Sequence, residues 1–364
     1  MSEWRSFTVA ELQEDGVLLV EDGNHGEYRP RPNEFIVGGT SFIRAADLKD
    51  GTVQFAAAGG INDVALARVR KGIGQPGDIL FSHKETVGKL ARVPMESPPF
   101  VCSPQTTFWR VLDESRLRRD FLYSFMRSRS FIDQWWARKG ETDMADYVSL
   151  TAQRQLRVAI PPPDVQRRIS EPLTAIDDLI ENNRRRIEVL ERMAQAIYRE
   201  WFVRFRYPGH EDATFMESPL GPIPKGWEVR PLGEISTLDR AAVQPGRCPA
   251  EKFNHYSIPV YDEGQLPVID SGESIKSGKY IVISPAVLVS KLNPRIERTW
   301  FVEPDVERRS VASTEFLVMR PTAGFSLGFT YLAARSEAFQ ASARSERRNL
   351  HQPSARQAGR LHAN

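Results

Sequence analysis

The stretch "IENNRRRIEVLERMAQAIYREWFVRF", residues 180–205, predicts one long helix near the middle of the chain. From Leu173 onward, apolar positions recur in alternating steps of three and four, which is the heptad pattern of a coiled-coil seam. The seam positions are Leu173, Ile176, Ile180, Asn183, Ile187, Leu190, Ala194, Ile197 and Trp201. Neither Gly nor Pro interrupts residues 173–205, and Tyr207-Pro208-Gly209 ends the pattern. At about 1.5 Å per residue, this predicts a rod of roughly 50 Å.

The same periodicity also fits a long amphipathic helix that buries one face in the core of a single domain. Two features favour a helix–helix zipper instead. The pattern continues for more than four regular heptads, and Asn183 places a polar side chain on the seam. A buried Asn sets the register and the partner of a coiled coil at a cost in stability. The predicted helix therefore requires a partner helix.

The composition fits a multidomain globular protein. The chain has 364 residues, of which 41% are hydrophobic and 26% charged, and its formal net charge is +2. No stretch approaches the roughly 18 apolar residues that span a bilayer, and the N-terminus lacks the pattern of a secretory signal. The two cysteines, Cys102 and Cys248, have no CxxC spacing. We therefore expect a cytoplasmic protein without a membrane, disulfide or zinc site.

The segments on either side of the predicted helix resemble each other. The pairs are "WRSFTVAELQED" from Trp4 with "WEVRPLGEISTLD" from Trp227, "GDILFSHKETVGKLARV" (77–93) with "PAVLVSKLNPRIERTWFV" (285–302), and "FLYSFMRSRSF" (121–131) with "FTYLAARSEAF" (329–339). The last pair aligns at a constant offset of 208 residues. Three matches in the same order indicate a duplicated domain. Each half mixes short β-type runs with a helical stretch near its end, which predicts an α+β fold.

These patterns divide the chain into five predicted segments. They are a first domain (1–160), a central coiled-coil helix (161–207), a linker rich in Pro and Gly (208–226), a second domain (227–340) and a tail (341–364). The tail holds five Arg and only two Leu, without a heptad or strand pattern. We expect it to be disordered, or to be an aberrant sequence left by a frameshift or truncation.

The chain resembles the specificity subunit of type I restriction–modification enzymes over about residues 1–340. The likeness lies in "SFIRAADLKDG" (41–51), "GDILFS" (77–82), "FLYSFMRSRSF", the block from "IPPPDVQRRISEP" through Phe205, and "GPIPKGWEVRPLGEI" (221–235). The resemblance implies two target-recognition domains, each of which reads half of a split DNA site, held apart by paired helices. It also implies that catalysis, with S-adenosylmethionine, ATP and Mg²⁺, belongs to a methyltransferase subunit and a restriction/translocase subunit.

Relatives in that family continue into a second long helix that pairs with the first. At the offset of 208, the counterpart of Ile160-Pro161-Pro162 would lie near position 368, beyond Asn364. The seam then lacks a partner within the chain, and the second domain is expected to be incomplete. A second copy of the chain could supply the missing helix.

Two basic loops are the candidate DNA contacts. They follow Ser82 and Ser290 in the repeated segment and contain His83, Lys84, Lys89, Arg92, Lys291, Arg295 and Arg298. Lys and Arg on phosphates supply affinity and position, whereas side chains at base edges supply specificity. The same residues could also be merely solvated loop cations. A rod of roughly 50 Å, at about 3.4 Å per base pair, would place two half-sites near 15 base pairs apart.

Two rival functions remain. A coiled-coil homodimeric scaffold would bind no specific DNA, and a footprint of two protected tracts would argue against it. A stand-alone adenine methyltransferase is suggested only by "SPPF" (97–100), which fits the loop that holds a target amine. No glycine-rich turn for S-adenosylmethionine accompanies this match, and the sequence has no GKS/GKT phosphate loop and no HExxH spacing. We therefore predict a non-catalytic chain that binds no metal or cofactor.

Overall fold

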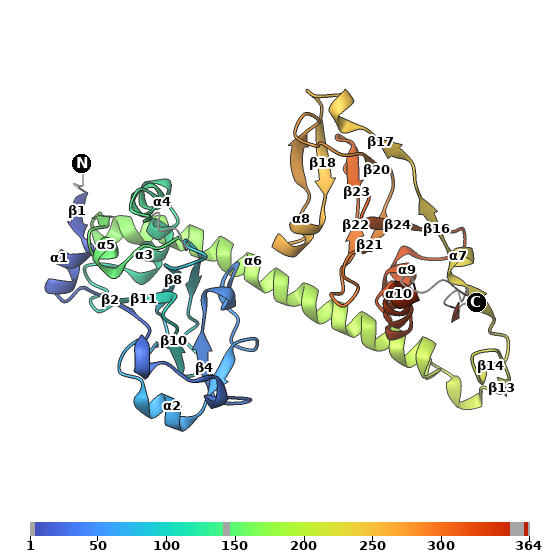
Figure 1. Ribbon diagram of the computed structural model, residues 1–364, viewed down its shortest axis with the longest axis horizontal. Helices are drawn as coiled ribbons and strands as arrows, with labels where there is room; N and C mark the ends of the chain where they lie inside the picture. The colour runs from blue at the N-terminus through green and yellow to red at the C-terminus, as the bar shows by residue number, and fades with distance from the viewer. Residues whose placement is uncertain (1–3, 141–145, 350–359, 363–364) are drawn as a thin grey trace. The chain divides into compact units, whose positions relative to one another are not determined.

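The chain divides into two compact units, residues 1–184 and 185–364, each of which mixes helices and strands (Figure 1). This computed structural model describes residues 4–140, 146–349 and 360–362. The mixed content agrees with the predicted α+β class. Within the described ranges, no helix is long and apolar enough to cross a membrane.

A six-stranded sheet forms the centre of the first unit. Its strands lie in the order β2 (Leu18–Asp22), β11 (Thr106–Val111), β8 (Ile79–Ser82), β9 (Leu90–Arg92), β6 (Gly51–Val53) and β5 (Leu48–Lys49). Strand β8 is buried on both faces, because Ile79 and Phe81 pack in one hydrophobic cluster and Leu80 packs in another. This double burial explains why the strand is a continuous apolar run rather than an alternating pattern.

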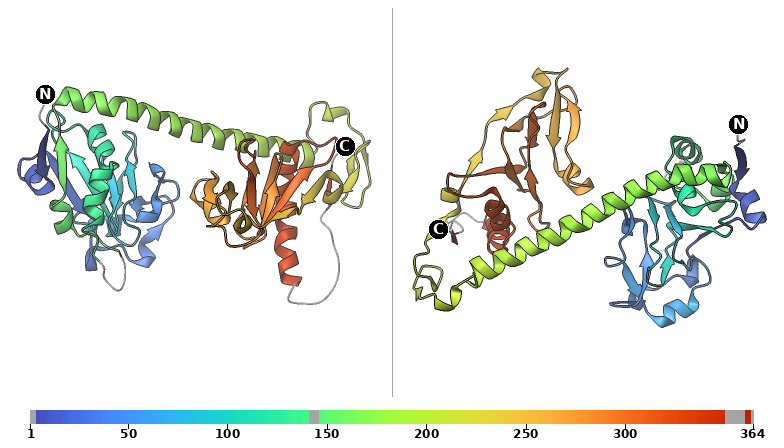
Figure 2. Two further views of the ribbon diagram at one scale, coloured as in Figure 1. Left: turned by 90° about the horizontal axis from the view of Figure 1, so that it is seen from above. Right: turned by 180° about the vertical axis from the view of Figure 1, so that it is seen from behind.

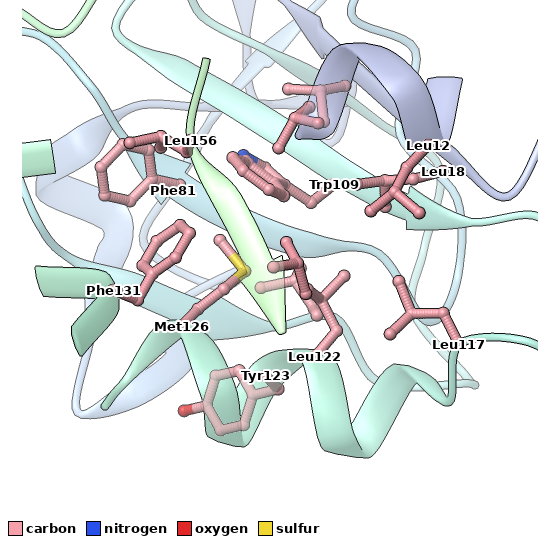
Figure 3. Packing of buried hydrophobic residues seen from close by; sticks show 14 of the residues in the cluster. Leu12, Leu18, Phe81, Trp109, Leu117, Leu122, Tyr123, Met126, Phe131 and Leu156 are labelled. Atoms are coloured by element: carbon pink, nitrogen blue, oxygen red, sulfur yellow. The ribbon is translucent and has the colours of Figure 1, made fainter. Parts of the chain in front are cut away.

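Further elements complete the first unit. A second sheet has the order β10 (Phe100–Cys102), β4 (Thr40–Ile43), β7 (Gly59–Ile61) and β3 (Phe35–Ile36), and β1 (Arg5–Thr8) pairs with β12 (Arg157–Ile160). The shorter helices are α1 (Val9–Glu14), α2 (Asp63–Arg68), α3 (Arg119–Met126), α4 (Arg129–Trp136) and α5 (Leu150–Arg154). The larger core lies where α3, α4 and α5 cover the six-stranded sheet, and Trp109, Phe81 and Phe131 are among its fully buried aromatic side chains (Figure 3).

The second unit contains two sheets. One has the order β16 (Ser236–Asp239), β24 (Phe316–Pro321), β21 (Ala286–Ser290) and β22 (Thr299–Val302). The other has the order β17 (Ala242–Val243), β20 (Lys279–Val282), β23 (Ser310–Ser313), β18 (Lys252–Tyr256) and β19 (Val268–Ser271). Short pairs join β13 (Phe215–Met216) to β14 (Ile223–Pro224) and β15 (Val229–Pro231) to β25 (Arg360–His362). The helices are α7 (Leu232–Ile235), α8 (Ile258–Glu263), α9 (Leu327–Ala334) and α10 (Glu337–Asn349).

The element bounds bear out the predicted duplication. Helix α9 coincides with α3 at the offset of 208, and α10 begins where α4 begins at the same offset. The order β2-β11-β8-β9 in the first unit corresponds to β16-β24-β21-β22 in the second, and every pair in both runs is antiparallel. The two units therefore share a four-stranded sheet with a helix that follows it.

The central helix, α6, runs from Pro163 to Tyr198, which is 36 residues and about 54 Å at 1.5 Å per residue (Figure 2). It begins ten residues before the predicted seam and passes through Pro172, whose missing N–H costs one helical hydrogen bond. A π-helical turn, Arg199–Val203, follows it. The large apolar seam residues are exposed, from 38% at Trp201 to 60% at Leu190. Asn183 is exposed and Ala194 is half-buried.

Within each unit, a stripe of α6 other than the seam contacts the rest of that unit. With Leu173 as heptad position a, the stripe is position e, and its residues are Ser170, Asp177, Arg184, Glu191 and Tyr198. Ser170 and Tyr198 are buried, and the three residues between them form ion pairs with the unit to which each belongs. The helix therefore binds its own units beside the seam and leaves the seam open.

The tail differs from the prediction at its start. We expected no regular structure from residue 341, yet α10 continues to Asn349. Phe339 packs in the cluster below α9, and the amide of Gln340 donates to the Ala334 carbonyl at 2.8 Å. These contacts anchor the first turn, and a sequence rich in Ala, Glu and Arg then favours continued helix. The expectation for residues 350–359 and 363–364 lies outside the described residues.

Candidate nucleic-acid interface

Two equivalent hairpins carry the candidate DNA contacts. The first joins β8 to β9 through residues 83–89, and the second joins β21 to β22 through residues 291–298. Ser82 and Ser290 each accept a backbone N–H with the side-chain oxygen, from Lys89 at 2.8 Å and from Leu292 at 3.1 Å. These bonds hold the start of each loop.

Both loops also contain a non-glycine residue in the left-handed backbone region. Glu85 has φ +65° and Asn293 has φ +49°, and the two are equivalent at the offset of 208. For a residue with a Cβ this conformation costs about 1–2 kcal/mol, so it persists only where the surrounding structure imposes it. Both loops therefore hold a left-handed residue at the equivalent position.

Four of the seven predicted contacts lie at or near the surface of these hairpins. Lys84, Lys291 and Arg295 are exposed. Lys89 is half-buried, and its Nζ donates to the Ala45 carbonyl at 3.2 Å. Flexible cations of this kind suit phosphate contacts, which require charge but no fixed geometry.

Arg92 and Arg298 bind the protein itself. The Arg92 guanidinium donates to Asp178 of α6 at 2.9 Å and lies over the Tyr123 ring, 5.2 Å from its centroid. Arg298 forms a bidentate pair with Asp262 at 2.7 and 2.8 Å. In this conformation both guanidinium groups pair with acids of the chain, and their contact with DNA stays a prediction.

His83 is also misplaced by the sequence prediction. Its side chain is fully buried, and its Nδ1 lies 3.2 Å from the Val148 carbonyl, while Nε2 has no hydrogen-bond partner. Burial lowers the pKa of His83 to about 4, because the charged imidazolium would lose its hydration. A buried neutral ring cannot contact DNA. Strand β8 ends at Ser82, but the buried environment extends one residue past its end.

His83 should make the stability of the first unit depend on pH. Between pH 6.5 and about 4 the unfolded chain binds a proton that the folded chain excludes, so acidification through this window weakens folding. The full loss is roughly 3 kcal/mol below pH 4. Urea denaturation of wild type and His83→Phe at pH 7 and pH 4.5 measures it. The wild type should lose more stability than the variant, and equal losses would contradict the assignment.

The "SPPF" motif does not form a base-holding loop. Phe100 begins β10 and is 1% exposed within a hydrophobic cluster, so its ring packs in the core. Among the residues that the structure describes, no three His, Cys, Asp or Glu side chains are grouped to hold a metal.

The residues that the sequence analysis missed join each hairpin to α6. In the first unit, Arg127 pairs with Asp177 of α6 at 2.5 Å and lies over the Tyr123 ring at 5.3 Å. Arg92 approaches the same ring and pairs with Asp178. We call these five residues the first clamp. The signal for it was present, because Tyr123 and Arg127 belong to the repeated segment.

The second unit has an equivalent group. The Tyr331 hydroxyl donates to Glu191 of α6 at 3.0 Å, and Arg335 donates to that hydroxyl at 2.7 Å. Arg335 also pairs with Glu191 at 3.2 Å and with Glu297, in the β21–β22 loop, at 2.6 Å. We call these four residues the second clamp. Burial of Tyr331 raises the pKa of its hydroxyl, which therefore stays protonated as a donor.

Comparison with known proteins shows similarity to one family over part of the chain. Residues 34–192 match the family described as "Type I restriction modification DNA specificity domain". The chain is 23% identical over 231 residues to the Type I restriction enzyme MjaIX specificity subunit of Methanocaldococcus jannaschii, with 55% of this chain and 53% of the relative covered. It is 24% identical over 200 residues to the putative MjaX specificity subunit of the same organism, covering 54% and 46%. The chain thus spans about half the length of the curated relatives it matches.

A solved structure has the same fold. The type I restriction–modification system S subunit from M. genitalium aligns with a TM-score of 0.56 at 13% identity, over all of this chain and 85% of that chain. The matched region includes the hairpin of the first unit, so the likeness to a DNA specificity domain covers that hairpin. The chain is therefore similar to type I restriction–modification specificity subunits, in sequence over about half of its length and in fold.

Proposed function

We propose that this chain binds double-stranded DNA at a split site, with one half-site read by each unit. The observation that supports this most strongly is the duplicated hairpin, which presents exposed cations from equivalent loops of two equivalent sheets. Cations on phosphates would position each unit, and neighbouring side chains of the loops would read base edges. The long helix α6 would then limit the allowed distance between half-sites.

We further propose that the chain itself is not an enzyme. It would direct an adenine methyltransferase subunit and a restriction/translocase subunit to the site, in the cytoplasm. Those partners would use S-adenosylmethionine, ATP and Mg²⁺, and this chain would need no cofactor. The surface of α6 beside the two units is the proposed docking region for the methyltransferase subunit.

Selection from a library of random DNA duplexes tests this proposal with the purified chain. The expected product is a pair of short fixed sequences separated by a gap of constant length and random sequence. A nuclease footprint on that duplex should then show two protected tracts. Recovery of a single continuous site, or of no preferred sequence, would overturn the proposal of a split site.

Lys291 and Arg295 should contribute affinity without specificity. Replacing either with alanine is expected to weaken binding by a similar factor on all duplexes, and to reduce the slope of log affinity against log salt by about 1 for each phosphate that is no longer neutralised. Binding titrations between low and moderate salt measure the slope. Lys225→Ala removes an exposed cation from the linker and should leave the slope unchanged. An unchanged slope in both hairpin variants would exclude this hairpin from the interface.

One observation favours the scaffold alternative. The apolar seam of α6 is exposed along its length, as expected for a helix that binds another helix. A coiled-coil homodimer with no specific DNA binding would show this seam too. The duplex selection distinguishes the two functions, because a scaffold enriches no sequence. A methyl-transfer assay on the purified chain alone tests the methyltransferase alternative, for which we expect no activity.

A further inference from the structure

The two clamps are built from the same parts in both units. Each has a tyrosine on α3 or α9 and, four residues later, an arginine just past the end of that helix, and in each the arginine pairs with an acidic residue at heptad position e of α6. In each the guanidinium lies over the ring of its own tyrosine, at 5.3 Å for Arg127 and 5.2 Å for Arg335. Since the guanidinium is planar, this stacking fixes the direction in which it can donate.

Each clamp also includes one residue of the candidate DNA-binding hairpin. In the first unit this residue is Arg92, which pairs with Asp178 of α6. In the second unit it is Glu297, which pairs with Arg335. The charges of the hairpin residue are opposite in the two units, yet the connection from hairpin to α6 is retained. A solvated loop would need no such connection in either unit.

The acids on α6 have a regular spacing. Glu191 follows Asp177 by fourteen residues in the same helix, which is two heptads, and Arg184 halfway between them pairs with Asp50 at 3.6 Å. Within one continuous helix, anchors at fixed heptad positions define both the distance along the axis and the direction of each contact. The clamps are therefore placed where they would fix the position of each hairpin along α6.

We propose that Tyr123–Arg127 and Tyr331–Arg335 are positioning residues that lock each hairpin to α6, and thereby determine how strictly the gap between two half-sites is read. This inference rests on the proposed split-site function. The clamp residues themselves need not touch DNA. Loosening one clamp should leave the half-site sequences unchanged and broaden the range of accepted gap lengths.

The test repeats the duplex selection with charge-reversal variants. Arg127→Glu places a carboxylate against Asp177 and should return the wild-type half-sites with several neighbouring gap lengths. The preference for the original gap over one that differs by a single base pair should fall by about tenfold, or about 1.4 kcal/mol. The double variant Arg127→Glu/Asp177→Arg restores an opposite-charge pair and should recover the single gap length.

Two further variants keep the outcome decisive. Arg129→Glu makes the same charge change two residues away, where Arg129 pairs with Asp133 of its own helix, and should keep the wild-type gap. Tyr331→Phe/Arg335→Gln keeps the ring but removes both the hydroxyl and the charge that bind Glu191, so it should broaden the gap even if Arg127→Glu fails to fold. Unchanged gap preference in Tyr331→Phe/Arg335→Gln and in folded Arg127→Glu would overturn the clamp proposal. A wild-type chain that selects no split site would overturn the proposed function instead.

Discussion

Replacing Asp78 with alanine is expected to lower the free energy of unfolding of the first unit by about 3–5 kcal/mol. The Asp78 side chain is fully buried immediately before β8 and forms a bidentate pair with Arg110 of β11, at 2.7 and 2.8 Å. It also accepts the backbone N–H of Gln75 at 2.7 Å. The substitution would leave Arg110, whose side chain is only 16% exposed, as a desolvated charge without its partner.

Burial works against the charged form of this carboxyl. Desolvation raises the pKa of Asp78, although the hydrogen bonds from Arg110 and Gln75 act in the opposite direction. The ion pair itself therefore adds little net stability. The expected loss of stability arises because Asp78→Ala leaves a buried arginine without its partner, rather than from the strength of the pair. An Asp78→Ala/Arg110→Leu double variant should accordingly recover part of the loss, which would separate the two contributions.

The second unit supplies a matched control. Arg320 of β24 pairs with Asp239 of β16 at 3.1 Å, and both side chains are partly exposed, at 42% and 21%. Asp239→Ala should therefore cost less than about 1 kcal/mol. Hydrogen exchange in increasing urea, followed on peptides from β8, β11, β16 and β24, measures each unit separately within the full chain. Equal losses in the two variants would contradict the argument from burial.

The sequence predicted those features that local patterns encode. The heptad steps of α6, the α+β character and the duplication all follow from periodicity and internal similarity. The motif "GDILFS" also has a clear physical basis in the structure. Gly77 adopts φ +83°, and a Cβ there would lie 2.0 Å from the Arg119 guanidinium. Asp78 is the buried ion-pair partner, and the four residues after it are fully buried.

The site residues were predicted less well because their roles depend on partners distant in the sequence. A basic residue in a loop has the same local pattern whether it faces solvent or an acid on another element. Arg92 and Arg298 find their acids at Asp178 and Asp262, and nothing near either arginine in sequence indicates this. His83 resembled a loop residue because it follows a serine, but the buried strand environment extends past Ser82.

The duplication was also described only approximately by one offset. Helices α3 and α9 match at 208 residues, whereas strands β11 and β24 match at 210, so that Arg110 corresponds to Arg320. A shift of two residues keeps each side chain on the same face of the sheet, so the core tolerates it. It conceals the correspondence from a comparison at constant offset. The two arginines also pair with acids that are not equivalent in sequence, Asp78 for Arg110 and Asp239 for Arg320, which makes their correspondence harder to recognise.

Replacing Ile187 and Leu190 with aspartate should abolish association of α6 with another helix. Both residues belong to the predicted seam, and 58% and 60% of their surfaces are exposed in the single chain. In a coiled coil each of these side chains would be buried, which would stabilise the association by about 1.5–3 kcal/mol per residue. Removing both would weaken association by about a hundredfold or more, and buried aspartates would add a desolvation penalty. Light-scattering mass of the chain, alone and with a methyltransferase subunit, measures this association.

A control on the same helix tests whether the seam, rather than general hydrophobicity, drives association. Val189 is 45% exposed and lies between the two seam residues in sequence, but off the seam. Val189→Asp makes the same chemical change and should leave the measured mass unchanged.

Asn183→Leu should strengthen association while allowing alternative registers, because the buried Asn of a seam selects one register at a cost in stability. A wild-type chain that remains monomeric with and without the methyltransferase subunit would contradict the zipper, and the exposed seam would then need another occupant.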